Sequence, residues 1–451
     1  MIAAAGPEVT HRRILGLALP MTLANVTTPL LGLVGTAAVG RLGDAALLGA
    51  LALGAVIFDY LFWTFGALRM ATAGLTAQAT GAGDRAEIDR TLARALAVAL
   101  AVGLVMVALQ GPLAAAAFRL FGASPAVTAA LAEYFGVRIW CAPFTLANYA
   151  ILGSTLGRGR TDLGLGLQVA INAVNVCLTL LFVLGLGHGV AGAALATVLA
   201  EVAGTVLGLG VLRRLGARPW RVPLPAIVER AGLLRMLSVN GDVMVRTLAL
   251  ITALALFSGL GARAGDVTLA ANAVLQNLFL VGSFFLDGFA TAAEVLCGQA
   301  LGARDEAAFR GAVRLSLGWC LGFALAVSGL FLALGGPFID AVTAAPEVRS
   351  FARDYLVYAA LTPLAAAAAF AFDGIYIGAT WTRAMRNLML AALAVDAAML
   401  ALTRDLGNAG LWLAMLAFLA ARGLGQALLY PRLAAGAFPH PQGAALEGAT
   451  R

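Results

Sequence analysis

Long apolar runs constrain this chain more than any other feature of its sequence. They recur from residue 14 to residue 436, and most of them are long enough to cross a bilayer, which takes about 20 residues as a helix. The chain is 61% hydrophobic and 12% charged, whereas a soluble domain carries about 25% charged residues. The runs are continuous rather than alternating, which disfavours a membrane β-barrel. The sequence therefore predicts an all-α polytopic membrane protein.

Twelve transmembrane helices are predicted from these runs. The expected spans lie near residues 14–39, 46–79, 92–118, 130–156, 163–186, 190–212, 236–260, 267–300, 312–339, 352–379, 384–403 and 407–435. The longest connection is rich in proline and arginine, a composition typical of a stiff linker. We therefore expect four segments: a six-helix lobe (11–214), a cytoplasmic linker (215–233), a second six-helix lobe (234–436) and a disordered tail (437–451).

The two halves of the chain match at a constant offset of 221 positions. Among the less common residue types, the matched pairs are Gln78 with Gln299, Asp84 with Asp305, Pro125 with Pro346, Tyr134 with Tyr355 and Thr161 with Thr382. Such a run of matches indicates an internal duplication. Each half holds an even number of spans, so both halves enter the membrane in the same direction. The sequence thus predicts a parallel repeat, which is found in some transporters.

The distribution of arginine predicts the orientation. The chain has no lysine, and its 30 basic residues are all arginine. With the N-terminus inside, 20 arginines fall in inner loops and ends, and six fall on the outer side. Because cytoplasmic loops carry an excess of basic residues, both termini are expected in the cytoplasm.

Enzyme signatures are nearly absent from the sequence. There is no P-loop, and the GxGxxG match at 187–192 joins two membrane spans instead of following a strand. The three histidines lie in a terminus or a loop, and the four cysteines are scattered without CxxC spacing. The chain has no arginine-rich tail of the kind that binds nucleic acid. We expect no enzyme activity, no cofactor, no metal site and no nucleic-acid partner.

Carboxylates inside apolar spans are the strongest functional signal in the second half. Asp287 and Glu294 are seven residues apart and share one helix face. A shared acidic face marks a cavity or an ion path by default; the alternative is a polar pair satisfied by neighbouring helices. Gln276 is a further candidate for the cavity lining.

Two other acids of the second half differ in their local partners. Asp242 and Arg246 are four apart and can pair on one face, which favours a structural role. Asp373 has no sequence-local partner, so it is the preferred candidate for binding a proton or a cation. Its pKa is expected to be raised by burial, which would allow proton exchange near neutral pH.

The first half carries an amide stripe. Gln168, Asn172 and Asn175 recur at spacings of four and three, on one face of the fifth span. Such a stripe either joins helices or lines a wet cavity. The remaining cavity candidates of this half are Asn25, Asp59 and Arg69.

Several stretches resemble one known family. They include 30–43, 68–78, 171–175, 269–274 and 373–379, which read LLGLVGTAAVGRLG, LRMATAGLTAQ, INAVN, LAANAV and DGIYIGA. Together they resemble the multidrug and toxic compound extrusion (MATE) transporters, and most of all their DinF-like branch. The resemblance covers nearly the whole chain. It implies two six-helix lobes around a central cleft.

The first lobe departs from the pattern of that branch at two places. Gly35 stands where the family usually carries an aspartate in the first helix, and Thr179 stands where it carries another in the fifth. Asp59 and Glu201 are then the acids left deep in the spans of this lobe, whereas the second-lobe carboxylates are all present.

The resemblance implies a proton- or sodium-coupled antiporter of the inner membrane that exports cationic or amphipathic small molecules by alternating access. We expect a multi-pass monomer whose partners are the substrate, the coupling ion and the lipid bilayer. The alternatives are a flippase-like protein, a coupling-deficient paralogue, or a non-transporting membrane protein.

Overall fold

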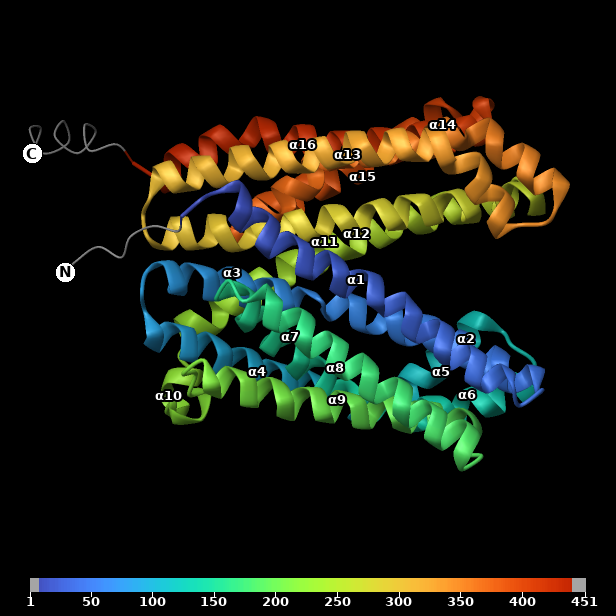
Figure 1. The fold of residues 1–451 in the computed structure, drawn as a ribbon, viewed down its shortest axis with the longest axis horizontal. Helices are drawn as coiled ribbons and strands as arrows, with labels where there is room; N and C mark the ends of the chain where they lie inside the picture. Colours follow the sequence, from blue (N-terminus) through green and yellow to red (C-terminus); the bar gives the residue numbers. More distant parts are fainter. Residues whose placement is uncertain (1–7, 440–451) are drawn as a thin grey trace, which may run out of the picture. The chain divides into compact units, whose positions relative to one another are not determined.

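The computed structural model describes residues 8–439, apart from the side chains of residues 28–31 and 33 within the first helix. Most of the expected disordered tail therefore lies outside the described residues. Within the described range the chain is almost entirely helical (Figure 1).

Several spans of the first half are divided into shorter helices. They are α1 (His11–Gly40), α2 (Ala45–Phe65), α3 (Ala67–Gly81), α4 (Arg85–Ala108), α5 (Gln110–Phe121), α6 (Pro125–Arg138), η1 (Ile139–Cys141), α7 (Ala142–Gly157), α8 (Thr161–Thr179), η2 (Leu180–Gly185) and α9 (Gly189–Arg214). The connection to the second half holds η3 (Pro219–Arg221) and α10 (Leu224–Ile227).

The helices of the second half are longer. They are α11 (Arg230–Arg263), α12 (Asp266–Gly302), α13 (Glu306–Val342), α14 (Pro346–Gly378), α15 (Thr382–Leu402), η4 (Arg404–Leu406) and α16 (Asn408–Ala437). α14 packs against α12, α13 and α16, and α15 packs mainly on α16 (Figure 1).

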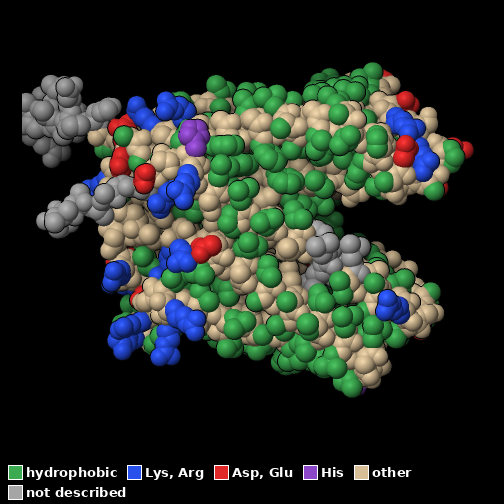
Figure 2. Space-filling model, in the orientation of Figure 1, with side chains coloured by type: hydrophobic (Ala, Val, Ile, Leu, Met, Phe, Trp, Pro, Cys, Tyr) green, Lys and Arg blue, Asp and Glu red, His purple; other side chains and the backbone are tan. Residues whose placement is uncertain are grey.

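Ten of the described helices are long and apolar enough to cross a membrane. They include α2 with α3 and α8 with η2, each taken as one span. Two further elements complete the set of twelve: α1, with 30 residues, and the interrupted helix α6–η1–α7. In the view of Figure 2, hydrophobic side chains cover the sides of the helices, and arginines gather toward their ends. The predicted fold class is confirmed: an all-α, multi-pass membrane protein with twelve helices in two lobes.

The chain divides into two compact units. The first lobe consists of Leu19–Ala79 and Asp84–Met244. Among the described residues, the second lobe consists of 8–18, 80–83 and 245–439. The division falls inside α11, close to its middle, and the whole connection between the halves belongs to the first lobe.

The connection is fastened to the first lobe by one buried arginine. Arg94 of α4 donates to Glu229 at 2.7 Å, to the carbonyl oxygen of Ala226 at 3.0 Å and to Glu87 at 3.0 Å. Its side chain is only 3% exposed. The segment around α10 is therefore packed on α4, in place of a free linker.

The internal duplication is visible in the helix bounds. Four pairs of elements begin 221 positions apart: α2 and α12, α4 and α13, α6 and α14, and α8 and α15. The lobes differ in continuity, because α12, α13 and α14 run unbroken where the first lobe is interrupted at Gly66, at Leu109 and at Ile139–Cys141. The repeated scaffold thus carries its irregular backbone in the first lobe.

Equivalent glycines set the same helix contact in both lobes. A Cβ on Gly153 or Gly157 of α7 would lie 2.5 Å from the carbonyl oxygen of Arg69 or Ala73 of α3. Gly374 and Gly378 of α14 meet the carbonyl oxygens of Ala290 and Glu294 of α12 in the same way. Small residues allow this close backbone approach between helices in a membrane.

We expect Gly374→Ala to destabilise the protein by about 1–3 kcal/mol, the usual cost of forcing extra atoms into a packed contact. Gly318→Ala on α13 is the matched control, since nothing lies within 4 Å of a Cβ there. Thermal unfolding in detergent, followed by size-exclusion chromatography, provides the measurement. Equal midpoints for the two variants would show that the close contact between α12 and α14 is not required.

Candidate functional site

A buried charge cluster occupies the second lobe. Asp373 of α14 is 5% exposed. Its carboxylate accepts hydrogen bonds from Arg246 of α11, from Arg422 of α16 at 2.5 Å and from the Gln426 side chain at 2.8 Å. Three helices therefore converge on one carboxylate.

Asp373 has no sequence-local partner, but it is not unpaired, so the ground for preferring it as the proton site is lost. Its partners come from α11 and α16, far away in sequence, and inspection of its own helix could not reveal them. A buried carboxylate with two guanidinium partners and an amide donor is satisfied as an anion, and removing it leaves two buried cations without compensation. Asp373 thus has a structural role, whatever its part in transport.

The cluster carries one more positive charge than negative. The Arg422 guanidinium lies 6.0 Å from the ring centroid of Phe370 and 5.8 Å from that of Phe418, so aromatic faces also stabilise it. The Nε atoms of Arg246 and Arg422 have no hydrogen-bond partner. The group formed by Asp373, Arg246 and Arg422 is therefore net cationic, while Glu294 and Asp396 are buried acids of the same lobe outside it.

The other predicted coupling residues lie in different environments. Glu294 is 3% exposed, whereas Asp287 on the same face of α12 is exposed and Gln276 is half-buried. Asp242 is buried and belongs to the first lobe, on the other side of the division in α11 from Arg246. Asp287 lies within electrostatic range of the Arg422 guanidinium.

The amide stripe of α8 connects three helices in the first lobe. Gln168 donates to Asn172 at 3.1 Å, and Asn172 donates to Thr27 of α1 at 3.3 Å. Asn175 donates to Thr197 of α9 at 3.0 Å and accepts from Thr179 at 3.2 Å. These bonds form a polar seam, by which we mean Thr27, Gln168, Asn172, Asn175, Thr179 and Thr197.

The sequence leaves open whether this stripe joins helices or lines a wet cavity, and the two ends of the seam differ in this respect. Asn175 and Thr179 are buried, and their bonds join α8 to α9. Gln168 and Asn172 are half-buried, as is Asn25 on α1. The buried end therefore joins helices, and the half-buried end is accessible from outside the packed core.

Gly35 is not a close-packing glycine. The nearest atom to a Cβ built there is Leu51 Cδ2, at 4.0 Å. This contrasts with Gly153 and Gly157, whose Cβ atoms would meet backbone at 2.5 Å. The site of the missing first-helix carboxylate therefore has room for the first atom of a side chain.

A second polar group of the first lobe surrounds the interruption between α6 and α7. Asn148 of α7 donates to the Glu201 carboxylate at 2.7 Å and to the Glu201 carbonyl oxygen at 2.9 Å. Thr205 of α9 donates to Asn148 at 3.1 Å. Glu201 was not among the site residues predicted from sequence. The sequence signal that distinguishes it is its match to Arg422 across the repeat.

Arg138 faces the same region from α6. It donates to the Cys141 thiol at 3.0 Å, and its guanidinium lies 5.4 Å from the ring centroid of Phe58. Asp59 of α2 is exposed, and Arg69 of α3 is half-buried. Both are within electrostatic range of Tyr149 on α7, as are Arg138 and Glu201.

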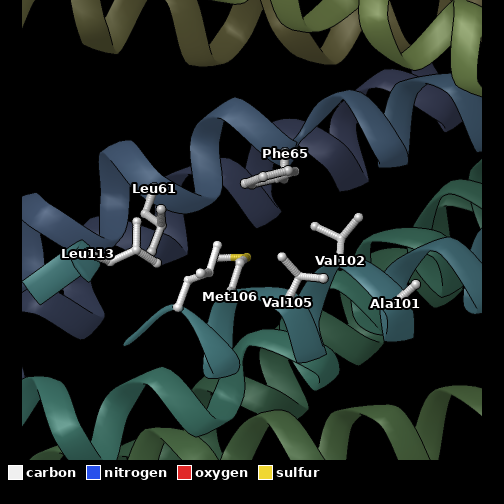
Figure 3. A pocket seen from close by; sticks show the side chains of 8 residues that line it. Leu61, Phe65, Ala101, Val102, Val105, Met106 and Leu113 are labelled. Atoms are coloured by element: carbon white, nitrogen blue, oxygen red, sulfur yellow. The ribbon is translucent and has the colours of Figure 1, made fainter. Parts of the chain in front are cut away.

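An apolar pocket of about 360 Å³ lies between α2, α4 and α5. Leu61 and Phe65 of α2 face Val102 and Met106 of α4 across it (Figure 3). None of its lining side chains carries a charge or a hydrogen-bonding group. It can hold a hydrocarbon group but offers nothing to recognise an ion.

Comparison with known proteins identifies the family to which this chain belongs. The MatE family model matches residues 20–181 and 244–402, which is one segment in each half of the repeat. The chain belongs to the MatE family.

Two relatives and one solved structure illustrate the membership. The chain is 38% identical to DNA damage-inducible protein F of Escherichia coli K12 over 92% of this chain and 91% of the relative. It is 31% identical to a probable multidrug resistance protein NorM of Bradyrhizobium diazoefficiens, over 70% and 69% of the two chains. The bent form of the Vibrio cholerae MATE transporter VcmN shares the fold with a TM-score of 0.84, at 20% identity, over 94% of this chain and 97% of that chain.

Membership in the MatE family supports a transport function. The Bradyrhizobium relative is named a probable multidrug resistance protein, and the Vibrio cholerae structure is that of a MATE transporter. Within this family member, the described polar groups include a cationic cluster in the second lobe, and a polar seam and an amide–carboxylate group in the first.

We expect Asp373→Asn to destabilise the second lobe by about 3–5 kcal/mol, because it leaves two buried guanidinium groups unpaired. The double variant Asp373→Asn/Arg246→Gln should recover part of this loss, since it restores the original net charge. The readout is thermal unfolding in detergent.

Asp340→Asn serves as the control for Asp373→Asn. It removes the pair of Asp340 with Arg353, whose side chains are 41% and 48% exposed, and such pairs contribute about 0–1 kcal/mol. If Asp373→Asn unfolds at the same temperature as Asp340→Asn, the buried cluster does not hold the lobe together.

Proposed function

We propose that this MatE-family chain is an ion-coupled antiporter that exports cationic or amphipathic small molecules across the inner membrane by alternating access. The observation that carries the proposal is the polar seam, which combines a buried end that joins helices with a half-buried end inside an otherwise apolar bundle. Small-molecule sites combine apolar walls with a few placed polar groups in this way. The name of the NorM relative supports the export of drug-like compounds.

The substrate contacts in this proposal come mainly from the first lobe. Asn25, Gly35, Asp59, Arg69, Gln168, Asn172, Asn175 and Thr179 line the path there, and Arg246 and Gln276 contribute from the second lobe. Among the residues that the sequence singles out, the candidates for proton or sodium coupling are Asp287, Glu294, Asp373 and Asp242. Residues 11–214 and 234–436 act as the two moving bodies of a monomer, and both termini face the cytoplasm; the excess of arginine in the loops on the side of the termini supports this orientation.

Reconstitution into proteoliposomes tests the proposal. Ethidium accumulation should respond to an imposed pH gradient or to an imposed sodium gradient, and it should vanish when both gradients are collapsed. Exchange of ethidium without any response to either gradient would identify a coupling-deficient carrier. Scrambling of a fluorescent lipid without ethidium transport would identify a flippase.

Position 35 provides a separate test of the cavity. We expect Gly35→Asp to fold, because a Cβ there has open space and the seam amides can bond a carboxyl group in either protonation state. The new carboxyl should add a pH-dependent step to ethidium release beyond that of wild type, with faster release at low pH, where protonation removes the charge that holds the cation. Gly35→Asn is the matched control. Identical pH profiles for wild type and both variants, at equal expression, would place residue 35 outside the ion path.

A further inference from the structure

The last helix of each half carries a charged residue at the same repeat position, but with opposite sign. Glu201 of α9 corresponds to Arg422 of α16 at the offset of 221. Each is followed four residues later by a polar side chain, Thr205 or Gln426. Each also faces the fourth span of its own lobe, where Asn148 bonds Glu201 and Asp373 bonds Arg422. The repeat thus keeps a charged residue at this position of the last helix with the opposite sign, whereas the partners Asn148 and Asp373 stand at different repeat positions.

The two versions of this contact differ in how strongly the charge is compensated. Arg422 is 2% exposed and directly paired with Asp373. Glu201 is half-buried, and its described side-chain hydrogen bond comes from a neutral amide. A carboxyl bonded by an amide can gain a proton without breaking an ion pair, since an amide both donates and accepts.

We propose that Glu201 is the proton-binding carboxyl of the first lobe, with Asn148 and Thr205 as its positioning residues. The inference rests on the proposed antiport function and names the residue that couples it. Glu201 stands at neither Gly35 nor Thr179, the two positions where the family usually carries an aspartate. It supplies a negative charge to the first lobe from α9 instead.

The position of Glu201 connects it to the substrate path. Thr197, Glu201 and Thr205 are spaced by four residues, which places them along one face of α9. Thr197 bonds Asn175 of the seam, and Glu201 follows it by one helical turn. A change in the charge of Glu201 therefore alters the electrostatic potential along this face of α9, as far as the contact of Thr197 with the seam.

The charges around Glu201 give the coupling its sign. Arg138 on α6, Cys141 on η1 and Tyr149 on α7 are the titratable groups within its electrostatic range, and Asn175 of α8 reaches α9 through an amide. Ionised Glu201 offsets the charge of Arg138 and favours a bound organic cation. Protonated Glu201 leaves the charge of Arg138 less compensated, with Asp59 of α2 as the remaining acid in its range, and disfavours that cation, so proton and cation compete, as antiport requires.

Glu201→Gln tests this assignment, because glutamine keeps the length of the side chain and its ability to bond Asn148. In proteoliposomes the variant should lose ethidium accumulation driven by a pH gradient, by about fivefold or more, the lower bound of typical coupling between two ligands. Counterflow exchange of ethidium at equal pH should remain near the wild-type rate. Asp396→Asn, which removes another buried acid at 4% exposure in the second lobe, is the matched control and should retain the driven accumulation.

Binding in detergent supplies a readout that is independent of transport. Wild type should bind ethidium more weakly as the pH falls, and Glu201→Gln should bind with no such pH dependence, whereas Glu201→Asp should restore it. If Glu201→Gln does not fold, Asn148→Leu provides the test, because loss of the positioning amide should shift the midpoint of the pH profile. An unshifted midpoint would overturn the inference.

The outcomes distinguish a failure of the proposed antiport function from a failure of the role of Glu201. Wild-type protein that responds to neither gradient would contradict the proposed function itself. Wild type that responds to a pH gradient, together with Glu201→Gln that responds equally, would overturn the role of Glu201 and leave the antiport function standing.

Discussion

A polar group inside a membrane must find its partner within the protein, because lipid offers none. The second lobe meets this constraint at Asp373, where donors from α11 and α16 converge on one carboxylate of α14. The first lobe meets it through amides and hydroxyls on α1, α7, α8 and α9. The positions of the helices in each lobe depend on these contacts, since apolar side chains gain little by leaving lipid for one another.

The fold was largely predictable from sequence, for identifiable reasons. Apolar runs of membrane length fix the spans, and matches such as Pro125 with Pro346 reveal the repeat that the helix bounds reproduce. The interruptions were less visible. The one at Ile139–Cys141 lies within an apolar run, one residue before Ala142–Pro143, and hydropathy alone passes through it without a break.

The candidate site was only partly predictable, because its contacts are non-local. The spacing of Gln168, Asn172 and Asn175 gives a shared face, and the structure shows that this face bonds to Thr27 and Thr197. Asp373 shows where spacing is insufficient. It has no partner on its own helix, yet it accepts a hydrogen bond from Arg422 of the neighbouring helix α16, 49 positions away in sequence. Sequence spacing finds the partners on the same helix, and packing supplies the rest.

The two lobes now carry different electrostatic roles on one repeated scaffold. In the second lobe the repeat position on α16 is a cation locked to Asp373, with aromatic rings over it, and the surrounding helices are unbroken. In the first lobe the same position on α9 is an acid held by an amide, and the helix facing it is interrupted at η1. A locked ion pair resists any change of charge, because separating it exposes two ions to a low dielectric. An amide-bonded carboxyl beside an irregular helix resists such a change far less. A duplicated bundle that has to change its charge once per transport cycle is therefore expected to do so in the lobe whose backbone and polar contacts are the less rigid of the two.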